Sequence, residues 1–225
     1  MGVNRGGKIV TNDLVFCLDF GSKRCYTSGT TANDLAGSND GTLTNGPIFN
    51  DENGGSIFFD GANDYVEIPE ATISSLGVTN GGPVTLITTF KASASEQGMI
   101  FAFSDSPRCY IETFVQNGSL VVHWGLGGTN SSTTSTAFIE TGKIYHYATC
   151  YDGSTVKTYL NSDPRDEKTN MIAGSYNTNS LRIGKYTNGF PLYFNGNVYN
   201  CSIYNRSLSQ EEIKQNYNST RGRFE

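Results

Sequence analysis

The sequence predicts an all-β protein, a sandwich or barrel of many short strands with one short helix near its C-terminal end. Two observations carry this prediction. Asx-Gly pairs, which favour the backbone of tight turns, are scattered along all 225 residues and separate short apolar runs. The 13 Phe and 13 Tyr residues argue against disorder and supply a bulky core, although only 36% of the chain is hydrophobic.

Two hairpins are the clearest strand pairs. Residues 109–124 form one around an Asn-Gly pair, and residues 144–160 form another around an Asp-Gly pair. In an earlier expected strand, alternation places Val66 and Ile68 in the core and Glu67 outside it. Further strands are expected at 13–20, 55–60, 64–68, 83–91, 98–103, 180–184 and 192–204.

One stretch has the features of a helix. Ser209 and Glu212 have the spacing of a capping box, and Leu208 and Ile213 can pack together as the hydrophobic staple around it. These signals predict a helix over about residues 210–217. Such a helix is too short to build a core, so we expect it to cover the surface of the strands.

Nothing in the sequence marks a second core, so we expect one domain over residues 13–217. Residues 1–12 are then an N-terminal arm and residues 218–225 a C-terminal tail. Both segments are basic although the whole chain has a net charge of −5, and the arm carries Arg5 and Lys8. We hypothesise that these segments dock on a neighbouring subunit, since charged ends can form charge-assisted hydrogen bonds there.

Composition and charge exclude several classes of protein. With 16 basic and 21 acidic residues there is no electrostatic case for binding nucleic acid. No apolar run is long enough for membrane insertion, and the first residues lack the apolar segment of a signal peptide. Five widely spaced cysteines predict free thiols in a protein made in the cytosol; they are Cys17, Cys25, Cys109, Cys150 and Cys201.

Four segments follow one another in a specific order. They are residues 34–43 (DLAGSNDGTL), residues 55–66 (GSIFFDGANDYV), the hairpin at 145–161, and residues 181–213, which run from LRIG to the start of the helix. Together they resemble a laminin-G-like domain of the concanavalin-A-like lectin/glucanase superfamily. The resemblance covers residues 13–217 and implies a concanavalin-A-like jelly-roll sandwich of two antiparallel sheets with one short C-terminal helix.

The flanking segments at 9–19 and 213–224 resemble stand-alone domains encoded by tailed bacteriophages. This resemblance implies a non-enzymatic virion structural protein, made in the host cytoplasm and displayed as a decoration, spike or fibre component. Its partners would be other virion proteins, further copies of itself, and glycans of the host surface. Two alternatives stay open: a free carbohydrate-binding lectin module, and a glycoside hydrolase or lyase.

Catalysis is tested by the superfamily's glucanase motif, Glu-x-Asp-x-x-Glu, which places carboxylates on one face of a strand. The chain has no such string. Glu112 is the only acidic residue in its expected strand, and the acidic cluster at 163–167 is expected to form a Pro-containing turn. His123 and His146 fall in different hairpins, and we interpret them as ordinary strand residues. We therefore expect no enzymatic activity.

One polar turn is a candidate calcium site. Asp60, Asn63 and Asp64 bring three oxygen-bearing side chains onto a tight turn, and calcium prefers such ligands. The resemblance also raises this expectation, although the superfamily often has a late acidic pair where this chain has residues 198–200 (VYN). Turn geometry alone also explains Asp and Asn at these positions, so both interpretations stay open.

Four aromatic residues are candidate glycan contacts. Sugar-binding sites stack sugar rings against exposed aromatic faces, and a Gly/Asn-rich stretch outside the strand pattern holds several such rings. The alternatives are packing at the end of the sandwich and contact with another subunit. The residues are Tyr176, Tyr186, Phe190 and Tyr193.

Overall fold

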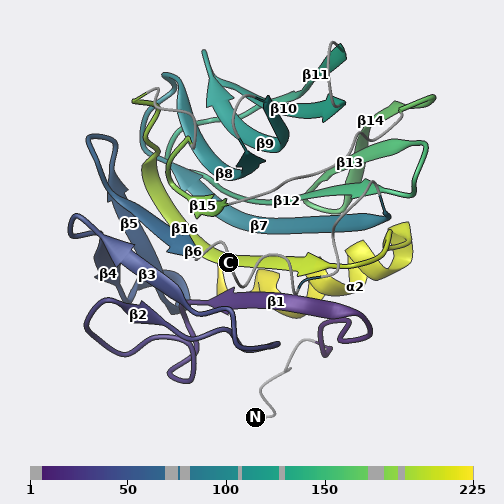
Figure 1. Cartoon of the computed structure of the whole chain (residues 1–225). Coiled ribbons are helices and arrows are strands. Elements are labelled where there is room, and N and C mark those ends of the chain that lie inside the picture. Colours follow the sequence, from purple (N-terminus) through teal and green to yellow (C-terminus); the bar gives the residue numbers. More distant parts are fainter. Residues whose placement is uncertain are drawn as a thin grey trace.

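The protein is an antiparallel β-sandwich, seen in a computed structural model that describes residues 7–68, 76, 82–105, 108–126, 130–171, 180–186 and 191–224. Figure 1 shows the two layers, with strands β8–β10 on one side and helix α2 on the opposite side of the molecule. This arrangement confirms the predicted jelly roll of two antiparallel sheets with one C-terminal helix.

The first sheet, sheet A, has the strand order β14-β13-β12-β7-β16-β5-β4, and β1 also pairs with β16. The long strands β7 and β16 lie at its centre, and each is antiparallel to its neighbours. Its strands are β1 (Leu14–Asp19), β4 (Ile48–Asn50), β5 (Ser56–Asp60), β7 (Val84–Ala92), β12 (Ile144–Tyr151), β13 (Val156–Leu160), β14 (Asp163–Lys168) and β16 (Asn195–Tyr204).

The second sheet, sheet B, has the order β11-β10-β9-β8-β15-β6-β3-β2. The predicted hairpin around the Asn-Gly pair is β9 and β10, and its register is antiparallel throughout. The strands are β2 (Thr31–Ala32), β3 (Gly41–Thr44), β6 (Tyr65–Ile68), β8 (Gly98–Asp105), β9 (Arg108–Gln116), β10 (Ser119–Leu126), β11 (Asn130–Phe138) and β15 (Ser180–Ile183).

The main core fills the space between the sheets. It is built largely from aromatic side chains, as the composition predicts, and Phe16, Phe59, Phe90 and Tyr151 are each fully buried in it. The alternation expected in β6 is confirmed, because the side chains at 66 and 68 are buried in this core while the side chain at 67 forms an ion pair outside it.

Several strands were not expected from the sequence. The acidic cluster at 163–167 is not a turn: it is the edge strand β14, fully exposed and paired with β13. The Ser/Thr-rich stretch at 130–138 is β11, which pairs with β10. The short strands β2, β3 and β4 were also missed. An edge strand needs backbone pairing on one side alone, so its sequence can lack the apolar pattern of a central strand.

Helix α2 (Gln210–Thr220) begins with the predicted capping box, in which Ser209 and Glu212 each accept a hydrogen bond from the other's backbone. It continues three residues past the predicted end at 217. The hydroxyl groups of Ser219 and Thr220 donate to the Asn216 carbonyl, which satisfies an acceptor in the last turn. Two short 3-10 helices are η1 (Glu52–Gly54) and η3 (Arg221–Arg223).

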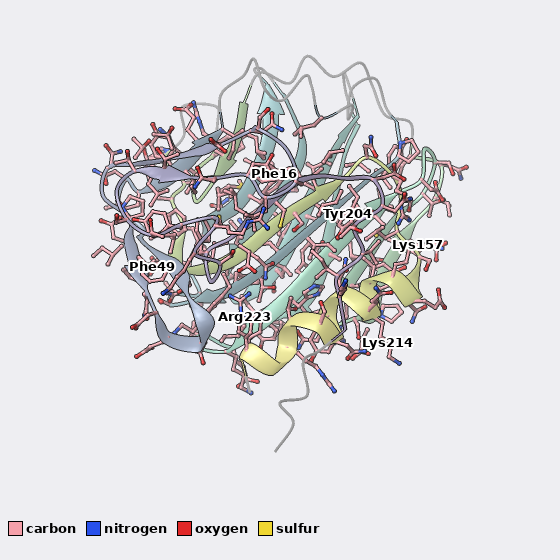
Figure 2. The ribbon with its side chains drawn as sticks, turned by 90° about the horizontal axis from the view of Figure 1, so that it is seen from below. Phe16, Phe49, Lys157, Tyr204, Lys214 and Arg223 are labelled. Carbon is pink, nitrogen blue, oxygen red and sulfur yellow. The ribbon has the colours of Figure 1, made fainter. Side chains whose placement is uncertain are left out.

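Helix α2 packs on the outer face of sheet A, the face turned away from sheet B (Figure 2). Its apolar contact is small, because Ile213 and Asn216 are its only buried residues. Both members of the predicted staple take part. The apolar cluster beneath the helix is Val10, Ile87, Ala148, Cys150, Tyr159, Tyr204, Leu208 and Ile213.

A closed set of hydrogen bonds joins this helix to the last strand and to the N-terminal segment. The Tyr204 hydroxyl donates to the Val10 carbonyl at 2.9 Å, and the Asn216 Nδ2 donates to that hydroxyl at 3.0 Å. The Val10 N–H in turn donates to Asn216 Oδ1 at 2.8 Å. All three groups are buried, so each bond is made where water cannot replace it.

Ordered packing extends beyond the predicted domain boundaries at 13 and 217. Val10 is buried under the helix, and the Lys8 carbonyl accepts a hydrogen bond from Gln215. At the other end, Arg223 forms an ion pair with Asp19 at 2.8 Å. The basic tail therefore contacts the sandwich itself, whereas residues 1–6 lie outside the described part of the chain.

Four of the five cysteines are buried free thiols, and the side chain of Cys109 lies outside the described part. Burial raises the pKa of Cys17 and Cys150 to about 11, so these thiols are protonated at neutral pH. Within the described residues, no helix is long and apolar enough to cross a membrane.

His146 lies on the outer face of sheet A and is buried against the Tyr217 ring of α2, with 5.6 Å between ring centroids. Burial lowers the pKa of this imidazole to about 4, because the charged form cannot be hydrated there. The His146 imidazole is therefore neutral in the folded protein at pH 7.

We expect Tyr204→Phe to lower the free energy of unfolding by about 1–3 kcal/mol, because Val10 and Asn216 would stay buried without their partner. Urea unfolding measures this change. Tyr26→Phe is the matched control, since the Tyr26 hydroxyl donates locally to the Gly29 carbonyl. Equal losses in the two variants would contradict a special role for the Tyr204 contact.

Acidification should weaken the fold through His146. Its pKa is about 4 when folded and 6.5 ordinarily, so between these values the unfolded chain binds the proton and the folded chain does not. The free energy of unfolding should fall by up to about 3 kcal/mol from pH 7 to pH 4 through this group. His146→Phe should remove that part of the slope in urea titrations at each pH. An unchanged slope would refute the assignment.

Candidate functional site

A row of paired side chains crosses the outer face of sheet B. The strand registers place His123 opposite Glu112, Glu112 opposite Ala102, Ala102 opposite Arg182, and Arg182 opposite Glu67. Paired residues of antiparallel strands project to the same face. Ile111, the neighbour of Glu112 in β9, points into the core between the sheets. Because side chains alternate along a strand, Glu112 and the rest of this row point outward, away from sheet A.

The most unusual pair in this row is Glu112 and His123. Glu112 Oε2 lies 3.1 Å from His123 Nδ1, and their side chains are 4% and 34% exposed. The carboxylate favours the imidazole tautomer with its proton on Nδ1, which leaves Nε2 as a hydrogen-bond acceptor. The Phe114 ring meets the imidazole edge to face, with 4.7 Å between centroids, and fixes its plane.

The second oxygen of Glu112 has no partner among the described residues. Oε1 is buried and accepts no hydrogen bond from the described residues. A buried carboxylate oxygen in this state costs free energy, and such costs concentrate at functional sites. The pair therefore combines a buried acid with a half-exposed histidine that the acid orients.

An apolar cluster surrounds this pair. Tyr186 packs against it from outside and stays half-buried. The chain reaches this position through Gly184, whose φ of 88° is accessible to glycine and where a Cβ would lie 2.7 Å from the Phe59 ring. The cluster itself consists of Met99, Ala102, Phe114 and Val121.

The other end of the row carries an ion pair and stacked rings. Arg182 Nη2 lies 2.8 Å from Glu67 Oε1. The ammonium group of Lys185 lies 4.3 Å from the centre of the Tyr65 ring and 5.5 Å from that of Tyr193. These cation–π contacts hold the rings in place.

The four predicted aromatic contacts thus lie in different places. Tyr186 belongs to the apolar cluster beside Glu112 and His123. Tyr193 instead pairs with Lys185 through a β-bridge, and its ring faces that ammonium group. Tyr176 and Phe190 lie outside the described residues. Their role as glycan contacts stays a prediction.

In the predicted calcium turn, the carboxylates accept hydrogen bonds from the backbone of the turn itself. Asp60 Oδ1 accepts hydrogen bonds from the backbone N–H groups of Ala62 and Asn63, at 2.7 and 3.3 Å. These bonds lower the pKa of Asp60. Asp64 Oδ2 accepts from the Asp60 N–H at 3.2 Å, and burial raises the pKa of Asp64. The turn explains these side chains without an ion.

No group of three or more His, Cys, Asp or Glu side chains that could hold a metal occurs among the described residues. Calcium at Asp60, Asn63 and Asp64 therefore stays a prediction from the sequence. The carboxylates of the turn serve its own backbone, which is the second of the two interpretations that the sequence left open.

The sequence contains a signal for the Glu112–His123 pair, which is the symmetry of their hairpin. In a hairpin with a two-residue turn at Asn117 and Gly118, residues placed symmetrically about the turn face each other. Positions 112 and 123 are symmetric about it. His123 is a half-buried strand residue, as expected, and its pairing with the carboxylate opposite was not predicted.

A sandwich of two antiparallel sheets with one C-terminal helix places the chain among the jelly-roll class of all-β proteins. A laminin G-like family model, described as Concanavalin A-like lectin/glucanases superfamily, matches residues 59–214. The chain belongs to this superfamily. A search of curated protein sequences finds no match.

Solved structures share the fold at low sequence identity. The chain is similar to Trypanosoma rangeli sialidase in complex with sialic acid, with a TM-score of 0.73, 18% identity, and coverage of 95% of this chain and 34% of the sialidase. It is similar to the receptor binding domain of botulinum neurotoxin C/D mosaic serotype, with a TM-score of 0.75, 12% identity, and coverage of 92% and 51%.

The binding domain of Paraclostridial Mosquitocidal Protein 1 is also similar, with a TM-score of 0.75, 15% identity, and coverage of 93% of this chain and 52% of that domain. The chain therefore spans a third to a half of these structures. At such identities the likeness shows the fold alone.

We expect Glu112→Gln to leave the free energy of unfolding at pH 7 unchanged or to raise it by up to about 1 kcal/mol. The amide oxygen can still accept from His123, and a neutral amide costs less to bury than an ionised carboxylate. Urea unfolding of both proteins measures the difference. A loss above about 2 kcal/mol would show that the charge itself stabilises the fold.

Proposed function

We propose that the chain is a non-enzymatic, lectin-like adhesion module that binds glycans on the outer face of sheet B. The observation that carries this proposal is His123, which the buried Glu112 and the Phe114 ring hold on that face, with the half-buried Tyr186 packed against the same apolar cluster as Phe114. The imidazole can accept a hydrogen bond from a sugar hydroxyl, and the aromatic ring offers a face for the apolar side of a sugar.

The fold supports a binding function as well. Two of the similar structures are a receptor binding domain and a binding domain, and each has the same sandwich. A third is a sialidase in complex with sialic acid. A binding function on this fold thus agrees with the chemistry of the outer face.

The absence of hydrolysis is part of the proposal. Most glycoside hydrolases use two carboxyl groups about 5–9.5 Å apart. Among the described residues of the row, Glu67 is the next carboxylate after Glu112, and the two are three strands apart. At a strand spacing of about 4.8 Å, this separation is about 14 Å. Glu67 is moreover paired with Arg182.

We further propose that the module is displayed on a phage particle, where it contacts other virion proteins and its own copies. This part is supported by the resemblance of residues 9–19 and 213–224 to stand-alone phage domains. Mass spectrometry of purified particles would find the chain at a fixed ratio to the major structural proteins. A chain recovered from lysate but never from particles would favour a free lectin.

Glycan binding is tested by His123→Ala. A glycan array screened with the wild-type protein identifies a bound glycan, and calorimetry measures its affinity. We expect His123→Ala to weaken this affinity at least tenfold, because the oriented acceptor is lost. The change also leaves the buried Glu112 carboxylate without its partner, so affinity is measured at a temperature where urea unfolding shows that the variant is folded. Lys214→Ala, an exposed change on α2 at the opposite side (Figure 2), is the control.

Two outcomes would contradict the proposal. Equal affinities of wild type and His123→Ala would remove the outer face of sheet B as the binding site. Release of reducing sugar from the bound glycan by the wild-type protein would show that the chain is an enzyme.

A further inference from the structure

A cavity of about 440 Å³ opens on the outer face of sheet A, on the side of the molecule opposite to His123 and Tyr186. Its volume falls in the range of small-molecule sites in proteins. Five separate parts of the chain line it: η1, the end of β7, the start of β12 with the residues before it, Asn161 after β13, and the end of α2 with the following tail.

The charge of the cavity is opposite to that of the chain. Lys91, Lys143 and Arg221 line it, and no acidic residue does, although the chain has a net charge of −5. Lys143 has a partner outside the lining, Glu140, at 2.7 Å, but both side chains are more than 60% exposed. Such exposed pairs contribute little and exchange readily. Lys91 and Arg221 have no carboxylate within ion-pair distance among the described residues.

One wall is a buried histidine with an unused ring nitrogen. His146 is 96% buried, and its Nδ1 has no hydrogen-bond partner among the described residues. The backbone N–H of the same residue donates to Asn161 Oδ1 at 3.0 Å. This bond leaves the Asn161 amide NH₂ as a donor at the cavity wall.

Aromatic rings and amides complete the lining. The Tyr217 ring packs against the His146 ring at 5.6 Å, and the Arg221 guanidinium lies 5.7 Å from the Tyr217 ring centre. Phe224 adds a second ring from the tail, and Asn53 adds an amide from η1. Cations bind an anionic group, amides bind hydroxyls, and rings pack against a sugar ring.

We propose that this cavity is a second binding site, specific for a sugar that carries a carboxylate. Lys91, Lys143 and Arg221 would face the carboxylate, Asn53 and Asn161 the hydroxyls, and Tyr217 with Phe224 the apolar face of the ring. The site is independent of the glycan surface on sheet B, because it lies on the opposite sheet and shares no residue with it.

The test is a titration of the full chain with glucuronate, followed by NMR amide shifts and calorimetry. Two ligands serve for comparison. Glucose has the same ring without the carboxylate, and inorganic phosphate is an anion without the ring. We expect glucuronate to bind at least tenfold more tightly than either, and to shift the amide signals of His146 and Asn161. Higher salt should weaken binding, because the contact is ionic.

Variants that each remove one positive charge test whether glucuronate binds in the cavity. Lys143→Gln and Arg221→Gln change exposed side chains, so the fold should persist, and each should weaken glucuronate binding at least fivefold. Lys157→Gln removes an exposed charge from β13, outside the cavity, and should have no effect. His123→Ala should bind glucuronate like the wild type, which separates this site from the proposed surface on sheet B.

Three results would overturn the proposal: no binding of glucuronate at millimolar concentration, phosphate binding as tight as glucuronate, or full binding by the double variant Lys143→Gln/Arg221→Gln. The second of these would identify a simple anion site with no selection for a sugar ring.

Discussion

The hydrogen bonds among Tyr204, Asn216 and Val10 fix helix α2 on the sandwich, and the outer face of sheet A depends on them. An isolated helix of 11 residues is marginal in water, and this one buries a single apolar side chain. Apolar contact alone would hold it weakly. The hydrogen bonds of Tyr204, Asn216 and Val10 add the attachment that the small apolar contact does not provide. A bidentate ion pair between Arg206 and Glu212 adds to them at the start of the helix.

The two sheets therefore build their surfaces by different means. On sheet B, register alone brings Glu112 to His123 and Arg182 to Glu67, and the segment after β15 adds Tyr186. On sheet A, the cavity wall at Tyr217 exists because a helix is docked over the strands. Loss of the docked helix would remove one surface and leave the other intact.

The parts of this structure that could be predicted are those with local causes. The capping box at Ser209 and Glu212 and the hairpin turn at 117–118 follow from a few neighbouring residues, and both are confirmed. The opposition of positions 112 and 123 also follows from the turn, once its symmetry is applied. Edge strand β14 was missed because a fully exposed strand carries no apolar alternation.

The cavity on sheet A was beyond prediction for a different reason. Its cations at 91, 143 and 221 are far apart in the sequence, and strand order together with helix docking brings them to one opening. The ordered tail gives this side a further property. The Lys8 carbonyl bonds to α2, and the Phe224 ring lies 5.0 Å from that of Tyr199. A tether attached beyond either residue would orient the molecule, turning sheet A toward the support and sheet B toward the surrounding solution.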